Sequence, residues 1–312
     1  MLIGILAGLT TCALWGLTFI APRAVDPAST WDLTVARYGI FGVVSVLLML
    51  HPRFRPRGLT CRRWLTGLSL GGAGYVGYFV AAAYAVRLAG AAIPPLVIGT
   101  MPVLLALIAN WRDRSAPWSA LAPPLALIAA GVAIVNISVI EAAGPEGREA
   151  VLLGVVAASA ALAIWIAYGL ANAAVMRAAD APDGLHWTGV QGIGAAIGSM
   201  ALLPLTSFST QPLAGPDMLN FLGWAAVMGI AGSWIATFCW GIASARLPLA
   251  LAAQLIVAET VFGLVYGFVY EARWPQTAEW VGATLQLIGV AVAVALFSRP
   301  GLSARGVGKA EA

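Results

Sequence analysis

Glu259 stands near the middle of an apolar run that extends from Pro248 to Tyr270. A helix of about 20 apolar residues spans the hydrocarbon core of a bilayer, so this carboxylate is predicted to lie close to the membrane midplane. An ionised acid there costs about 2.5–3.5 kcal/mol. Such a residue is expected to face a wet cavity or to have a partner on a neighbouring helix.

Two roles for Glu259 follow from this position. In the functional role it faces a cavity and either binds the ammonium group of a substrate or carries a coupled proton. In the structural role it is protonated, or hydrogen-bonded to a neighbouring helix, and only fixes the packing. The sequence supports both roles equally.

Aromatic and hydrogen-bonding side chains recur at helical spacing on four predicted helices. Such stripes often serve packing, but hydroxyl and indole N–H groups need partners in a dry environment, which favours faces toward a wet cavity. The four faces contain Thr11, Trp15 and Thr18; Gly71, Tyr75, Tyr78 and Ala82; Ala161, Trp165, Tyr168 and Asn172; and Ile230, Trp234, Thr237, Phe238 and Gly241.

Pro102 lies inside the apolar segment 91–110. It cannot donate a hydrogen bond to Ile98, so the helix is predicted to bend and to free a carbonyl between Gly99 and Met101. A broken helix at membrane depth is tolerated where it lines a cavity or packs on protein. With the aromatic faces and the buried acid, this gives the predicted substrate-binding residues: Trp15, Tyr75, Tyr78, Thr100, Met101, Trp165, Tyr168, Trp234, Phe238 and Glu259.

The elements that position these residues are predicted to be transmembrane helices. Hydrophobic residues make up 61% of the chain and charged residues 10%, whereas soluble domains carry about 25% charged residues. Continuous apolar runs differ from the alternating pattern of a membrane barrel, so the predicted fold class is an all-α integral membrane protein. Ten segments are predicted to cross the bilayer: 2–21, 33–50, 65–89, 91–110, 118–140, 151–173, 186–205, 219–243, 248–270 and 277–298.

The two halves of the chain resemble each other. A shift of 150 residues brings Trp15 onto Trp165, and a shift of 158 brings Gly71 onto Gly229, Gly74 onto Gly232, Asp113 onto Glu271, Pro117 onto Pro275 and Gly131 onto Gly289. With five spans in each half, the second copy must enter the membrane upside down, as in many secondary transporters. We predict two inverted five-helix repeats, 1–142 and 150–300, followed by a tail at 301–312.

Basic residues are distributed unevenly between the predicted loops. With the N-terminus inside, twelve Lys and Arg residues fall on the cytoplasmic side and four on the outer side. Since cytoplasmic loops retain basic residues, both termini are predicted to be cytoplasmic. This topology also explains the basic loop 51–63 and the formal charge of +4, with contact to anionic lipid as the second explanation. No nucleic-acid partner is predicted.

Three further residues receive structural assignments. Arg37, in the outer turn of the segment 33–50, is expected to extend to the membrane interface, with recognition of a carboxylate as the alternative. Trp187 is assigned to the interfacial aromatic belt. Trp240 is assigned to packing because it falls off the aromatic face of its helix.

Four stretches of the sequence carry a family resemblance: WGLTF at 15–19, ARYGIFG at 36–42, YAVRLAGAAIPPLVIGTMPV at 84–103 and IASARLPLALAAQLIVAETVFGLVYGFVYEARW at 242–274. Over nearly the whole chain the sequence resembles the ten-helix EamA family of the drug/metabolite transporter superfamily, and within it the YddG-type exporters of aromatic and other neutral amino acids. The resemblance implies a central cavity lined by the first four helices of each half. Thr260 departs from the family's usual proline after the glutamate, which puts a kink there in doubt.

The predicted function is a secondary transporter in the inner membrane that exports small neutral metabolites, chiefly aromatic and other neutral amino acids, by alternating access. Efflux of lipophilic cations, with Glu259 as the anionic partner, is the alternative. A channel or scaffold is a further class, which the repeat disfavours. No enzyme activity, metal or cofactor is predicted, because no cluster of His, Cys and acidic residues has catalytic or metal-ligand spacing within the predicted helices. The oligomeric state stays open.

Overall fold

The computed structural model describes residues 2–113, 117–176, 178–208, 210, 213–247 and 249–297, so the predicted tail at 301–312 lies outside the described residues. Within these ranges every regular element is a helix and no strand occurs. In chain order the elements are α1 (Leu2–Gly16), η1 (Leu17–Phe19), α2 (Ala21–Ala24), α3 (Thr30–Met49), α4 (Cys61–Ser69), η2 (Leu70–Tyr75), α5 (Val76–Ala89), α6 (Ile93–Ile98), α7 (Met101–Asp113), α8 (Trp118–Ala142), α9 (Gly144–Met176), α10 (Gly184–Met200), η3 (Leu203–Leu205), α11 (Gly215–Ala226), η4 (Val227–Ile235), α12 (Ala236–Arg246), α13 (Leu249–Tyr270) and α14 (Thr277–Phe297).

Long apolar helices dominate the fold. In the described part of the chain, six helical segments are long and apolar enough to cross a membrane: Leu2–Phe19, Thr30–Met49, Cys61–Ala89, Trp118–Ala142, Gly144–Met176 and Gly215–Ala243. Two further apolar helices, Leu255–Tyr270 and Thr277–Ala293, are shorter. The helical class agrees with the sequence-based prediction, while the number of ten spans stays a prediction.

The helix that contains Pro102 is interrupted, as its sequence predicts. α6 ends at Ile98 and α7 begins at Met101, so Gly99 and Thr100 separate two short helices. Side chains from other helices bond the backbone carbonyls of α6. Gln286 Nε2 donates to Leu96 O at 2.5 Å, and Thr260 Oγ1 donates to Pro95 O at 3.3 Å. These contacts satisfy polar backbone groups that have no access to water within a bilayer.

Two other helices change their winding without a break. η2 and η4 are π-helical and continue directly into α5 and α12. A π-helix accommodates an extra residue in its turn, so the side chains that follow are rotated relative to an α-helix. The rotation changes which residues of α12 face the interior.

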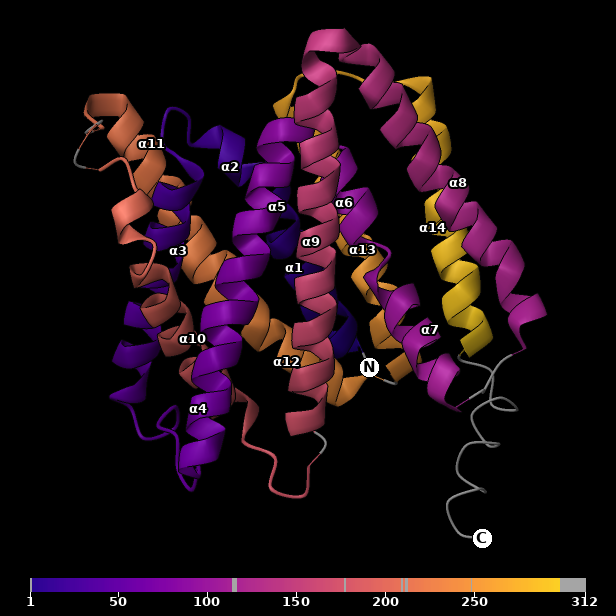
Figure 1. Cartoon of the computed structure of the whole chain (residues 1–312). Helices are drawn as coiled ribbons and strands as arrows, with labels where there is room; N and C mark the ends of the chain where they lie inside the picture. The colour runs from indigo at the N-terminus through magenta and orange to yellow at the C-terminus, as the bar shows by residue number, and fades with distance from the viewer. Residues whose placement is uncertain are drawn as a thin grey trace, which may run out of the picture.

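Helices from the two halves of the chain pack against each other in pairs. α8 and α14 lie side by side at one edge of the molecule, α3 and α10 lie together near the other, and α5 contacts α9 between them (Figure 1). The pairs α1 with α12 and α1 with α13 complete the interior. Glycine permits the closest approaches: a Cβ atom at Gly131 would lie 2.4 Å from Gly282 O, and one at Gly71 would lie 2.0 Å from Gln191 O.

The bundle has two ends, which we call the N-terminal end and the far end. α1 begins at the N-terminal end, where α9 ends and α10 begins (Figure 1). α2 lies at the far end, where α3, α9 and α14 begin (Figure 1).

Candidate functional site

A cavity of about 710 Å³ lies between the helices of the two halves. This volume falls within the range of about 300–1,000 Å³ that is usual for small-molecule sites. The lining continues to Met176 and Gly184, both exposed at the N-terminal end, so the cavity opens there. Its wall includes Trp15, Tyr75, Met101, Asn172, Trp165, Tyr168, Trp187, Gln191, Trp240 and Glu259.

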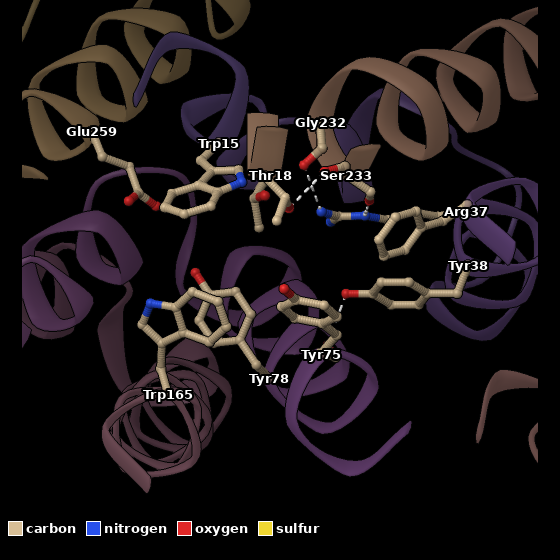
Figure 2. Close-up of a pocket in the computed structure, with 12 residues that line it drawn as sticks. Trp15, Thr18, Arg37, Tyr38, Tyr75, Tyr78, Trp165, Gly232, Ser233 and Glu259 are labelled. Carbon is tan, nitrogen blue, oxygen red and sulfur yellow. Dashed lines mark hydrogen bonds between the residues drawn. The ribbon is translucent and has the colours of Figure 1, made fainter. Parts of the chain in front are cut away.

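A smaller recess of about 30 Å³ adjoins the cavity. Trp15, Tyr75, Trp165, Thr237 and Glu259 line both spaces, so the recess is a side chamber of the cavity. Figure 2 shows residues that surround the recess, which also include Thr18, Arg37, Tyr38, Tyr78, Gly232 and Ser233.

Stacked aromatic rings form one wall of the two chambers. The Trp165 ring stacks on Tyr168 with centroids 4.7 Å apart and on Tyr78 with centroids 4.6 Å apart. Trp15 meets Trp165 edge to face at 6.0 Å, and Trp240 lies 6.0 Å from Trp15 on the other side. These rings give the cavity a rigid, largely apolar surface that can stack on a planar ligand.

A chain of hydrogen bonds holds this aromatic wall in place. The hydroxyl groups of Tyr75 and Tyr168 lie 2.8 Å apart and within hydrogen-bond distance of Gln191 Oε1, at 2.8 and 2.9 Å, so their two protons are shared among these three contacts. Gln191 Nε2 and the Trp187 indole N–H both donate to Asn172 Oδ1, at 2.9 and 2.7 Å. The chain joins η2, α9 and α10, so the polar groups of these five side chains have partners without a ligand.

Glu259 on α13 borders both chambers and is half-buried. Its carboxylate makes no hydrogen bond or ion pair with the described residues. None of the described residues therefore provides the hydrogen bond that would give Glu259 a purely structural role. In Figure 2 the carboxylate lies beside the Trp15 ring, across the recess from Arg37.

Arg37 does not extend to the membrane interface, so this sequence-based expectation is wrong. The side chain is only 5% exposed and points into the recess. Its Nε atom donates to Ser233 Oγ at 3.1 Å and its Nη2 atom to Gly232 O at 3.4 Å, both on η4. The close packing of α3 against η4 turns this arginine inward rather than along the lipid.

Three of the predicted residues lie outside both chambers. Trp234 stacks on Phe238 at 5.6 Å and packs near Phe54, while the Thr100 hydroxyl donates to Val97 O at 2.7 Å. Thr237 and Gly241 of the expected face do line the cavity, and Trp240 joins them because the π-helical turn in η4 shifts the inward face of α12. The assignment of Trp240 to packing is therefore corrected.

Trp187 is also corrected, because it is 4% exposed and lines the cavity instead of forming part of an interfacial belt. Gln191 was not singled out from the sequence. Its signal is a buried amide on a helix rich in small residues, which needs polar partners inside a membrane. Trp15, Tyr75, Tyr78, Met101, Trp165, Tyr168 and Glu259 lie on the walls of the chambers, and their contact with a substrate stays a prediction.

The fold and the cavity together describe an all-helical membrane protein with a central small-molecule chamber. The EamA-like transporter family matches residues 2–137. Inner membrane protein YtfF of Escherichia coli (strain K12) is 31% identical over 307 residues, which cover 94% of this chain and 95% of that protein. The chain belongs to the EamA-like transporter family.

A protein of known crystal structure shares the fold with a TM-score of 0.63. It is 24% identical, and the match covers 95% of this chain and 99% of the other. The shared fold thus extends over nearly the whole length of both chains.

Proposed function

We propose that the protein is a secondary transporter that exports aromatic and other neutral amino acids by alternating access around the central cavity. The observation that carries the proposal is the aromatic-walled cavity of about 710 Å³ that opens at one end of the bundle. Aromatic walls stack on the ring of a substrate, and few charged groups suit a zwitterion. The substrate is moved without chemical change.

We also propose that the fold consists of ten spans in two inverted five-helix repeats, 1–142 and 150–300. The two π-helices support this, because a shift of 158 residues places Leu70–Tyr75 within Val227–Ile235. The same shift relates Gly131 to Gly289, and each of these glycines lies at a close contact between α8 and α14. A local distortion repeated at one register is expected of a duplicated unit.

We propose that the protein lies in the inner membrane. The N-terminal end of the bundle then faces the cytoplasm. The excess of basic residues in the loops at that end supports this side as cytoplasmic. The name of the relative from Escherichia coli supports the inner membrane. In this orientation the cavity opens to the cytoplasm, from which an exporter takes its substrate.

Counterflow in liposomes tests the proposal. Vesicles that contain the purified chain and a high internal concentration of unlabelled L-phenylalanine should accumulate labelled L-phenylalanine transiently. Saturation and stimulation by internal substrate distinguish a carrier from an open pore. A chemically modified product, or uptake that is independent of internal substrate, would reject the proposal.

Efflux of lipophilic cations is the second candidate function. It is favoured by Glu259, whose carboxylate borders both chambers without a partner among the described residues. A quaternary ammonium compound tested in the same vesicles separates the two functions. If cations are the substrates, Glu259→Gln should abolish their flux, whereas cation flux that is unchanged in this variant would reject the second candidate.

A further inference from the structure

Arg37 is a buried cation that has no anionic partner among the described residues. The guanidinium is 5% exposed, and no carboxylate of the described residues lies within ion-pair distance of it. Its Nη1 atom has no hydrogen-bond partner in the part of the chain that the structure describes. A buried charge that is unpaired is costly, so a position of this kind points to an anion that is supplied from outside the chain.

The neighbours of Arg37 hold the guanidinium in a fixed orientation and supply no counter-charge. Neutral oxygens of Ser233 and Gly232 accept from Nε and Nη2. The guanidinium lies over the rings of Phe79, at 4.3 Å from its centroid, and Tyr38, at 5.1 Å. Ring faces stabilise a cation in part. The remaining edge of the guanidinium faces the recess (Figure 2).

The recess is larger than a single water site and adjoins the cavity. Its volume of about 30 Å³ exceeds the ~10–15 Å³ that one water molecule requires. Because Trp15 and Trp165 line both chambers, a ligand whose ring stacks in the cavity can place a group attached to that ring in the recess. A planar guanidinium presents a fork of donors that matches a carboxylate.

We propose that Arg37 binds the carboxylate of the transported substrate in this recess and so selects carboxylates over amines of the same shape. The inference rests on the proposed function, because it assigns the group by which the exporter recognises an amino acid. Glu259 borders the same recess from the opposite side. Since an acidic side chain supplies no counter-charge for a carboxylate, the arginine side of the recess is the place for the anionic end of the ligand.

Binding of three related compounds to the purified full-length chain tests this assignment. L-Phenylalanine carries both charged groups, 3-phenylpropionate lacks the ammonium group, and phenylethylamine lacks the carboxylate. Quenching of tryptophan fluorescence in detergent reports their affinities, since Trp15 and Trp165 lie in the cavity wall. The wild type should bind both carboxylates at least about tenfold more tightly than the amine.

Arg37→Gln should remove this preference by weakening both carboxylates and leaving phenylethylamine unchanged. Arg37→Lys keeps the charge without the fork and should lose the preference only in part. If the glutamine variant does not fold, the lysine variant tests the assignment instead: it should bind both carboxylates more weakly and phenylethylamine as tightly as the wild type does. Arg87→Gln is the matched control, because Arg87 is half-buried but bonds Asp26 and Ala28 O outside both chambers. It should retain the full preference.

Two results would overturn the assignment: a wild type that binds the amine as tightly as the carboxylates, or a folded Arg37→Gln variant that keeps the preference. The counterflow assay judges the proposed function separately. Arg37-dependent binding of 3-phenylpropionate without transport of phenylalanine would reject amino-acid export and keep the anion subsite. Transport of phenylalanine that does not depend on Arg37 would reject the anion subsite and keep amino-acid export.

Discussion

The two ends of the bundle are held in different ways. At the far end, Glu271 accepts from Arg23 at 2.6 Å and from Arg273 at 2.7 Å, and Arg273 also pairs with Glu279 at 2.6 Å. Hydrogen bonds that Arg273 donates to the carboxylates raise its pKa, with Glu279 as the largest cause. These ties link the segment after η1 to the start of α14, so they join the two halves of the chain.

The N-terminal end has one exposed ion pair in the described residues, between Arg63 and Asp180, and the cavity opens beside it between α9 and α10. An exposed ion pair contributes little to stability, whereas half-buried ion pairs that share a carboxylate contribute more. The comparison teaches that the cavity opens at the end with the single exposed pair, and we expect the shared ion pairs to hold the far end together. Alternating access would require those ties to separate.

The largest effect is expected from Glu271→Gln, because two arginines lose their shared carboxylate. The side chain of Glu271 is 15% exposed, and its loss should cost about 1–3 kcal/mol, or roughly 5- to 150-fold in the ratio of closed to open far ends. Thr18→Cys, placed in the recess of a chain without other cysteines, reports the opening. An impermeant maleimide applied outside whole cells should label it correspondingly faster.

Asp180→Asn is the control for this experiment, since it removes a pair at the opposite end and should leave the labelling rate unchanged. If the folded Glu271→Gln protein is labelled at the same rate as its parent, the ties at Glu271 do not close the far end.

An intermediate effect is expected from Gly184→Trp, which sharpens the location of the cavity mouth. Gly184 lines the cavity and is exposed, and nothing lies within 4 Å of a Cβ atom there, so the indole can be accommodated but will narrow the entrance. Flux should fall about fivefold, the equivalent of ~1 kcal/mol. Gly223→Trp, at an exposed and equally open position on α11, should transport normally. Equal flux in both variants would place the entrance elsewhere.

The smallest effect is expected from Asp180→Asn on stability. The hydrogen bond from Arg63 holds the pKa of Asp180 below its usual value, so its contribution is present at neutral pH and is lost as the pH falls through that lowered pKa. Because the pair is exposed, the Tm should fall by less than about 2 °C at pH 7. Wild type and variant should have the same Tm at low pH. A larger fall at pH 7 would show that this end is also held by its ion pair.

Periodicity and composition predicted the helical class and much of the cavity wall. Trp15, Trp165 and Tyr168 share faces at α-helical spacing in α1 and α9, and the structure places them around the cavity. The break before Pro102 followed from the missing donor of proline. Such features depend on local geometry, which the sequence specifies directly.

Contacts between distant segments were not predictable in this way. The inward orientation of Arg37 depends on where η4 packs. The face of α12 that lines the cavity depends on the π-helical turn in η4, which residue spacing does not predict. Both errors depend on η4, which contacts Arg37 and continues into α12. Because of the first error, the sequence did not predict that Arg37 lines the recess. A polar or charged residue near a predicted helix end is therefore better assigned after its packing partner is known.

Thr260 couples the acid of the cavity to the interrupted helix. It directly follows Glu259 on α13, and its hydroxyl bonds Pro95 O in the other half of the chain. Any rotation of α13 that swings the acid toward the opposite membrane face must release this bond beside the gap at Gly99. One hydrogen bond thus ties the part of α13 that carries Glu259 to the backbone of α6.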